Sequence, residues 1–266
     1  MMKVYISADI EGVCGIANWN EASKTHADYA EFRQRMTSEV VAACQAAIAC
    51  GARQIYVKDA HASGRNIIAE QLPECAVLIR GWSGHPFSMV QELDESFDAL
   101  LMIGYHSRAG SDANPLAHTM STKVAYIKIN GVLASEFLIH QYAAALENVA
   151  TVFISGDRGI CSEVKAANPN IETVAVLEGI GASTISIHPD LALKNIAAGV
   201  ERALQSDLDQ CAIELPEEFK VEIKYIDPVL AYKAAFYPGC SMLRSLTVEY
   251  STDDYFEVLR LLNFVV

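Results

Sequence analysis

The stretch Val4-Tyr-Ile-Ser-Ala-Asp-Ile-Glu-Gly12 indicates how this chain folds. Its first five residues are mostly apolar, which is typical of a short strand buried on both faces of a sheet. Asp9 and Glu11 follow two residues apart, so an extended chain directs both carboxylates the same way. Gly12 then allows a tight turn or a close approach of another backbone segment. The stretch predicts a buried strand that ends in a pair of acidic side chains.

Outward from this stretch, predicted strands and helices alternate. Apolar residues spaced near 3.6 residues predict a long helix over residues 28–49, and Gly51 supplies its end. Short apolar runs predict strands over residues 54–58, 76–79, 99–103, 124–129, 151–155, 173–177, 221–225 and 246–250. Helical patterns cover residues 67–71, 135–147, 188–204 and 253–262. This alternation predicts an α/β fold with a mainly parallel sheet flanked by helices.

Asn130-Gly131, directly after a predicted strand, is a strong signal for a hairpin turn. The second half of the chain predicts a smaller α+β subdomain. Further along, Glu214-Leu-Pro-Glu-Glu218 has the composition of a linker. We expect an α/β metal-binding catalytic domain over residues 1–160. A smaller α+β subdomain over residues 161–266 would complete the fold and supply oligomer contacts.

The composition argues against several classes of protein. The chain has 33 acidic and 20 basic residues and a formal net charge of -13, so it is a poor partner for nucleic acid or anionic lipid. No apolar run approaches the roughly 18 residues of a membrane span, and an acidic residue follows the start too soon for a signal peptide. The seven cysteines are scattered and odd in number, which argues against a disulfide framework. We expect a cytoplasmic protein that binds neither nucleic acid nor membranes.

Possible metal ligands recur at the ends of the predicted strands. The strand after the long helix ends in Asp59-Ala-His61, and a later strand ends in Gly-Tyr-His106. Because the carboxyl ends of parallel strands lie at one edge of a sheet, we expect these side chains near the first acidic pair. Glu136 begins a predicted helix, and a helix N-terminus favours an ionised carboxylate.

Two histidines and three carboxylates form a mixed nitrogen and oxygen set. Such a set suits Zn²⁺, Mn²⁺ or Co²⁺ better than Ca²⁺. Five ligands are more than one catalytic zinc ion takes, so Asp9 could bridge two ions about 3.5–4 Å apart. The plainer alternatives are a solvated turn for the acidic pair, loop or hydrogen-bonded roles for the histidines, and a surface position for Glu136.

Other histidines are candidates for other roles. Residues 107–118 are rich in Gly, Ser, Asp, Asn and Pro, a composition of functional loops. His118 at the end of this loop suits an acid–base group beside a metal site, with a plain loop position as the alternative. His140 lies one turn along the predicted helix, and it either adds a sixth ligand or packs in the core or an interface. We expect His26 and His85 at the surface.

These residues resemble the pattern of the M55 family of metallopeptidases, the D-aminopeptidases. Ser7-Ala-Asp-Ile-Glu-Gly12 matches the family signature SxDxEG, and further segments follow in family order over most of the chain. They are Lys58-Asp-Ala-His61, Pro86-Phe-Ser-Met-Val90, Gly104-Tyr-His-Ser-Arg-Ala109, His118-Thr-Met120 and the helix that Glu136 begins. The last part of the chain matches more loosely.

The resemblance implies two zinc ions per subunit and a catalytic histidine at His118. The ligands that it implies are Asp9, Glu11, His61, His106 and Glu136. It also implies removal of N-terminal D-amino acids from short peptides, such as D-Ala-D-Ala, by a homo-oligomer that is a ring-shaped decamer. Two departures from a member of the family bear on substrate preference rather than on the ligands: Gly156-Asp-Arg-Gly159 stands where that member has Gly-Asp-Asp-Arg, and His140 stands where it has Asn.

Two other functions fit the same ligand types. One is a metal-dependent hydrolase of another bond, a phosphoester or an amide, for which Arg65 and Arg108 are the obvious phosphate-binding candidates. The other is a non-catalytic peptide-binding metalloprotein. We expect a zinc-dependent aminopeptidase that acts on short peptides. Whether it prefers D- or L-amino acids at the N-terminus is a question for experiment.

Overall fold

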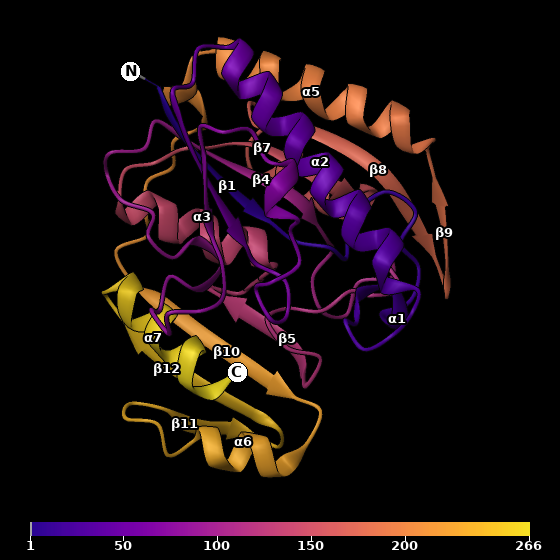
Figure 1. Cartoon of the computed structure of the whole chain (residues 1–266). Coiled ribbons are helices and arrows are strands. Elements are labelled where there is room, and N and C mark those ends of the chain that lie inside the picture. Colours follow the sequence, from indigo (N-terminus) through magenta and orange to yellow (C-terminus); the bar gives the residue numbers. More distant parts are fainter. Residues whose placement is uncertain (1) are drawn as a thin grey trace.

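The structure, a computed structural model, describes residues 2–266 and is built around a seven-stranded sheet (Figure 1). Strand β1 (Lys3–Ala8) lies within it, in the order β3-β2-β1-β4-β7-β8-β9. The first six strands in this order run parallel, and β9 is antiparallel to β8. Their bounds are β2 Gln54–Asp59, β3 Ala76–Ile79, β4 Ala99–Tyr105, β7 Thr151–Asp157, β8 Glu172–Ile180 and β9 Ser183–Ser186. The expected mainly parallel α/β sheet is confirmed.

Helices cover this sheet. Helices α2 (Tyr29–Ala49) and α5 (Pro189–Gln205) pack against each other, and Figure 1 shows them side by side above the strands. Helix α3 (Glu136–Leu146) packs against β4, and α4 (Arg158–Ala167) packs against β7 and β8. Every residue of β4 and β7 is buried, as is typical of strands covered on both faces. Within residues 2–266, no helix is both long and apolar enough to cross a membrane.

The direction in which the chain winds reverses at β1. From β1 the chain passes through α2 to β2 and β3 on one side, and it then returns to β4 on the other side. The loops after β1, β2 and β4 therefore leave the sheet at neighbouring carboxyl ends. Open α/β sheets form their ligand sites at such a point.

A second, antiparallel sheet lies beside the first, in the order β11-β12-β10-β5-β6 (Figure 1). Its strands are β5 Val124–Ile129, β6 Val132–Leu133, β10 Phe219–Tyr225, β11 Ser241–Arg244 and β12 Thr247–Thr252. Helices α6 (Pro228–Ala234) and α7 (Tyr255–Val265) pack on it, and α7 also contacts α3. The expected hairpin is present: Asn130 and Gly131 join β5 to β6 with φ angles of 51° and 83°.

The two sheets do not divide the chain at residue 160. Elements β8, β9 and α5 follow that residue but extend or cover the first sheet, whereas β5 and β6 precede it and belong to the second. The chain reaches β10 through residues 212–218, which have no regular structure and contain the expected linker. The division into two domains stays a prediction. We propose its boundary at this linker, with the β5–β6 hairpin assigned to the smaller unit.

Helix α4 and several elements of about one turn were not predicted from the sequence patterns. Helix α1 (Trp19–Ala22) has only four residues and is held by a capping box between Asn18 and Glu21. Helix α4 follows β7 without a loop, because the Asp157 carboxylate ends the strand and caps the helix at Ile160 N. The expected helix over residues 67–71 is a single 3-10 turn, Ala69–Gln71, and further 3-10 turns cover Ser88–Val90 and Leu208–Cys211. Elements of one turn are too short for a periodic pattern.

Candidate metal centre

Two glycines bring the loops after β1 and β4 into contact. Gly12 N donates a hydrogen bond to Gly104 O over 2.8 Å. A Cβ atom on Gly12 would lie 1.8 Å from Tyr105 O, and one on Gly104, whose φ is +70°, would lie 2.3 Å from Asp9 O. No larger residue fits at either position. This close approach holds Asp9 beside the strand end that carries His106.

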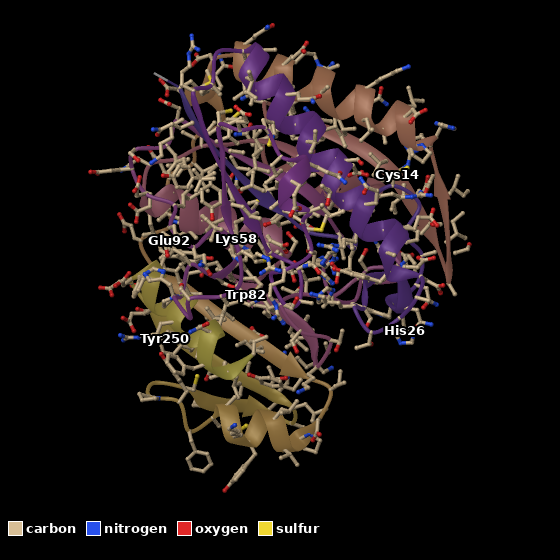
Figure 2. All side chains as sticks on the ribbon, viewed as in Figure 1. Cys14, His26, Lys58, Trp82, Glu92 and Tyr250 are labelled. Carbon is tan, nitrogen blue, oxygen red and sulfur yellow. The ribbon has the colours of Figure 1, made fainter. Side chains whose placement is uncertain are left out.

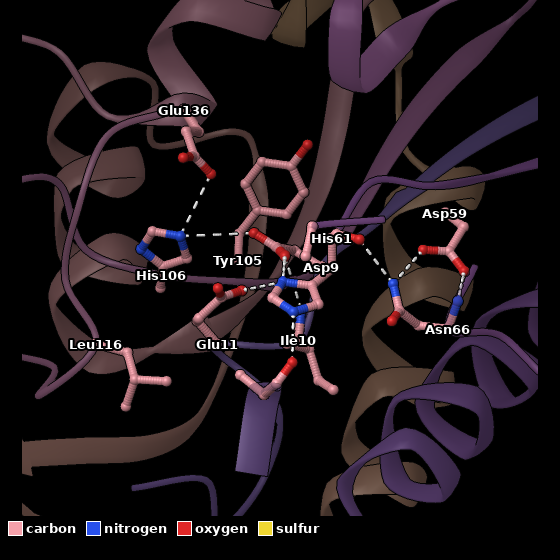
Figure 3. A network of polar contacts seen from close by, with 12 residues as sticks. Asp9, Ile10, Glu11, Asp59, His61, Asn66, Tyr105, His106, Leu116 and Glu136 are labelled. Atoms are coloured by element: carbon pink, nitrogen blue, oxygen red, sulfur yellow. Dashed lines mark hydrogen bonds and ion pairs between the residues drawn. The ribbon is translucent and has the colours of Figure 1, made fainter. Parts of the chain in front are cut away.

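The carboxylate of Asp9 lies between two groups of possible ligands (Figure 3). Its Oδ1 atom is 3.4 Å from His61 Nδ1, which is 3.0 Å from Glu11 Oε2. Its Oδ2 atom is 3.5 Å from His106 Nε2, which is 3.3 Å from Glu136 Oε2. Each oxygen therefore faces a different histidine, as expected of a carboxylate shared by two cations.

His118 completes the second group. Its Nε2 atom is 3.7 Å from Glu136 Oε1, and its ring stacks on that of His106 with the centroids 4.4 Å apart. The side chain of His118 is 14% exposed, whereas those of His61 and His106 are 6% exposed or less. It also lines a cavity of about 430 Å³. Of these three histidines, His118 is the one most open to a substrate.

A backbone carbonyl orients each of these three imidazole rings. The pairs are His61 Nε2 with Ala22 O at 2.8 Å, His106 Nδ1 with Ser107 O at 2.9 Å, and His118 Nδ1 with Leu116 O at 3.0 Å. Each nitrogen donates there through its hydrogen, so in the neutral ring the opposite nitrogen directs a lone pair toward the carboxylates. Metal-binding histidines are usually oriented by an outer hydrogen bond of this kind.

The polar atoms left at the centre fit cations. Glu11 Oε2 and His106 Nε2 are buried without a hydrogen-bond partner. Burial, and next the charge of Glu11, raise the pKa of Asp9 well above its usual value, because buried carboxylates repel one another. Imidazole nitrogens and carboxylate oxygens are ligands that Zn²⁺ accepts. A cation at each group would pair the free atoms and offset this repulsion.

The carboxylate of Glu136 is held in its ionised form. Burial alone opposes ionisation, but the positive charges of His106 and His118 in their protonated form outweigh it and lower the pKa of Glu136 to about 2. Met120 N also donates to Glu136 Oε1 over 2.6 Å. Glu136 stands in the first turn of α3, as the sequence predicts, where the helix dipole favours a negative charge.

Asp59 supports His61 instead of joining the ligands. Its carboxylate accepts hydrogen bonds from Asn66 N, Asn66 Nδ2 and Ile67 N, and Asn66 Nδ2 also donates to His61 O over 2.7 Å (Figure 3). These contacts fix the loop after β2 and so the position of the imidazole. The sequence places Asp59 at the strand end, but it does not show that its carboxylate turns toward backbone amides.

Asp157 supports the loop after β4 in the same way. Its carboxylate accepts from Ser107 N and Ser107 Oγ, each over 2.6 Å, and from Asn114 Nδ2 over 3.0 Å. Asn114 Nδ2 also donates to Glu11 O over 2.9 Å. The predicted functional loop, residues 107–118, is thereby attached both to β7 and to the acidic pair. No spacing in the sequence singles out Asn114 or Asp157 for this role.

The remaining histidines lie outside the two ligand groups. His140 is fully buried, and its Nδ1 atom lies 2.7 Å from Glu136 O, one turn earlier in α3. Burial lowers the pKa of His140, so the neutral ring is favoured in a core position. His26 is exposed, as expected. His85 is exposed too, but it lines the cavity.

The cavity wall contains further residues that the sequence patterns miss. Trp19 and Trp82 line it, together with Met89, Met120 and Asn263. Trp19 stands in α1, Trp82 in a loop after β3, and Asn263 in the last helix. Residues this far apart in the chain follow no common sequence pattern, and only the folded structure brings them together.

Comparisons with known proteins agree with this geometry. Residues 2–264 match the peptidase M55 family, described as D-aminopeptidase. The chain is 29% identical over 258 residues to a D-aminopeptidase of Bacillus subtilis (strain 168), covering 96% of this chain and 93% of that protein. In structure it is similar to "Zn-dependent D-aminopeptidase DppA from Bacillus subtilis, a self-compartmentalizing protease", with a TM-score of 0.92, 27% identity, and 98% of this chain and 95% of that one covered. The similarity extends far beyond the motifs around the site.

Proposed function

Because the chain belongs to the D-aminopeptidase family of peptidases, M55, we propose that it is a zinc-dependent aminopeptidase that removes N-terminal D-amino acids from short peptides. The observation that carries this proposal is the position of Asp9, whose two oxygens face two adjoining ligand groups. One zinc ion would be held by Asp9, Glu11 and His61. The second would be held by Asp9, His106 and Glu136.

Each residue at the centre then has a chemical role. Zinc in such a site lowers the pKa of bound water to about 7 and polarises a carbonyl, which is what amide hydrolysis requires. The Nδ1 atom of His118 is held by Leu116 O, so its Nε2 atom is free to take up a proton or to give one to the leaving amine. The stack on His106 fixes the plane of the ring.

The lining of the cavity bears on which charged groups of a substrate it can bind. Asp9, Glu11 and Glu136 line it, and in the proposed centre the zinc ions that they would hold offset their negative charge. Among residues 2–266, no Lys or Arg lines the cavity, and Arg65 and Arg108 lie outside its lining. The phosphoesterase alternative therefore gains no support from this site. For the same reason we expect no tight recognition of the peptide's C-terminal carboxylate by this subunit.

We also propose that the enzyme is a homo-oligomer, a decamer by family resemblance. The similar Bacillus protein is described as self-compartmentalizing, which requires several subunits. On this chain, Val229, Tyr232 and Phe236 in and beside α6 are 65–71% exposed, and Phe264 in α7 is 70% exposed. Several large apolar side chains exposed on neighbouring helices of the second sheet are typical of a protein–protein interface. Light scattering coupled to size-exclusion chromatography would measure the subunit number, and a monomer would overturn this proposal.

The proposed location is the cytoplasm. All seven cysteines are free, although several are buried or partly buried. Free thiols are typical of a reducing compartment.

Hydrolysis of D-Ala and L-Ala p-nitroanilides tests the function. We expect cleavage of the D-anilide, its loss after treatment with a chelator, and its recovery when zinc is restored. Asp9→Asn should be inactive, whereas Asp28→Asn, which changes an exposed carboxylate outside the ligand groups and the cavity lining, should behave as the wild type. Hydrolysis that survives the chelator would remove the metal from the mechanism. A preference for the L-anilide would keep the aminopeptidase and remove its D-specificity.

A further inference from the structure

The two tryptophans of the chain line the same cavity. Trp19 follows the loop after β1, and Trp82 follows β3. Each is 41% exposed, and both belong to the wall that also contains the metal ligands. Large aromatic side chains that remain open at the wall of a polar cavity are typical of a binding surface. Neither ring has a role in holding the proposed zinc ions.

The ring of Trp82 is held in place before any ligand arrives. Its Nε1 atom donates to Ala62 O over 2.8 Å, directly after His61 in the chain. The ammonium group of Lys58, a fully buried residue, lies 3.7 Å from the ring centroid and donates to Gly81 O over 2.8 Å. Figure 2 shows Lys58 and Trp82 close together in the middle of the molecule. A ring fixed in this way loses little side-chain entropy when it binds a ligand.

The ring of Trp19 places the second aromatic surface next to the reacting groups. It meets the imidazole of His118 edge to face, with the centroids 5.3 Å apart. Helix α1 is short, but its capping box fixes it: Asn20 N donates to Asn18 Oδ1 over 2.9 Å, and Ala17 N donates to Glu21 Oε2 over 2.7 Å. A group that touches Trp19 therefore lies beside His118, and so beside the bond to be cleaved.

The rest of the wall selects the kind of group that fits there. Ala62, Met89 and Met120 add apolar surface, and methionine adapts to side chains of different shape. Along the described chain, the titratable side chains of the lining are His85 and five residues of the metal centre, Asp9, Glu11, His61, His118 and Glu136. A cavity of about 430 Å³ has room for a side chain of the size of leucine or phenylalanine beside a peptide backbone.

We propose that Trp19 and Trp82 form an aromatic subsite that binds an apolar side chain of the peptide next to the scissile bond. This rests on the proposed function and adds to it a preference for peptides with leucine-like or phenylalanine-like residues. Alanine peptides would be cleaved, but they would leave the two rings uncovered. One such subsite contact in an apolar pocket discriminates by about 10–200-fold.

Tryptophan fluorescence gives a test that does not depend on turnover. The zinc-loaded protein is titrated with D-leucine, D-alanine and D-glutamate, each a potential product that cannot be cleaved further. D-Leucine should change the emission at a concentration about tenfold or more below that of D-alanine, and D-glutamate should bind worst. Trp19→Leu and Trp82→Leu each leave one reporter, and each reporter should respond. Emission that does not change, or equal affinity for all three, would overturn the subsite.

Peptide kinetics separate this inference from the proposed function. Dipeptide amides with D-Ala or D-Leu before or after the bond are compared by kcat/KM, and the D-Leu peptide should be favoured by about tenfold or more in one series. Trp82→Ala should bring this ratio close to one, Trp82→Phe should keep most of it, and Leu191→Ala on α5 should leave it unchanged. Equal cleavage of D-Ala and D-Leu peptides would refute the subsite while the aminopeptidase stands. Leucine-selective fluorescence without cleavage of any peptide would refute the aminopeptidase while the subsite stands.

Discussion

Replacing Gly12 by alanine should disable the metal centre without altering any ligand. The added Cβ atom would lie 1.8 Å from Tyr105 O, 2.6 Å from Tyr105 C and 2.8 Å from Gly104 C. Real Cβ atoms essentially never approach other atoms within 3.0 Å, and the atoms here are backbone that cannot rotate away. The loop after β1 and the end of β4 must therefore move apart by about 1 Å or more.

The size of the effect follows from what these two segments carry. The loop after β1 holds Asp9 and Glu11, and β4 leads directly to His106. A misplacement of about 1 Å at a catalytic centre costs on the order of 100-fold in rate. Forcing an extra methyl group into packed structure costs about 1–3 kcal/mol in the free energy of unfolding. We expect Gly12→Ala to bind less zinc, to lose about 100-fold or more in kcat/KM, and still to fold.

The assay needs three readings on purified protein: zinc per chain by mass spectrometry, kcat/KM with D-Ala p-nitroanilide, and urea unfolding. Gly131→Ala is the matched control, because Gly131 lies in the β5–β6 hairpin with nothing within 4 Å of its added Cβ atom. Its φ of +83° makes that substitution cost about 1–2 kcal/mol, with zinc content and turnover unchanged. Wild-type zinc content and turnover in Gly12→Ala would refute the reasoning.

Three further changes test separate parts of the site and the core. His118→Ala should keep its zinc and lose about 10²–10⁴-fold in kcat, since it removes an acid–base group; steady-state kinetics that match the wild type would remove His118 from the mechanism. Asp9→Ala should lose zinc from both groups, because each group uses one oxygen of this carboxylate; mass spectrometry that finds the wild-type metal content would contradict the bridge. Burial raises the pKa of Glu39 from 4.5 to about 7. Between these two pH values the folded protein binds a proton that the unfolded chain has lost. Its free energy of unfolding therefore falls as pH rises, by about 3 kcal/mol in all. Arg35 and the Cys14 amide, which partly stabilise the charged form of Glu39, are still present in Glu39→Gln. Urea unfolding of this variant between about pH 5 and pH 8 should lack the decline in stability. If the stability of the variant and of the wild type changes with pH in parallel, Glu39 is already ionised in the folded protein.

The sequence predicts that the candidate ligands of the inner centre lie close together, for a physical reason. Asp9, His61 and His106 each follow a strand of one parallel sheet, and parallel strands end at a common edge. Glu136 is predictable as the first residue of a helix, but its approach to His106 depends on how α3 packs against β4. The local patterns therefore select these residues as candidate ligands, and the strand order brings them together.

The parts that could not be predicted depend on contacts across long distances in the chain. The β5–β6 hairpin is visible in Asn130-Gly131, yet nothing in that turn shows that β5 pairs with β10, about a hundred residues later. Trp82 reaches the cavity from a loop and Asn263 from the last helix, and no periodic pattern in the sequence connects these two positions. Asp59 shares a strand end with His61, but its carboxylate accepts hydrogen bonds from backbone amides of its own loop, a contact that the strand pattern does not show.

The central claim is that one carboxylate, Asp9, joins two zinc sites in a single peptidase centre. Its most direct test is the titration of metal-free protein with zinc while bound metal and the hydrolysis of D-Ala p-nitroanilide are followed together. Two zinc ions per chain are expected, with turnover rising until the second ion is bound. Saturation of both signals at one zinc ion per chain, or full turnover before any zinc is added, would contradict the shared site.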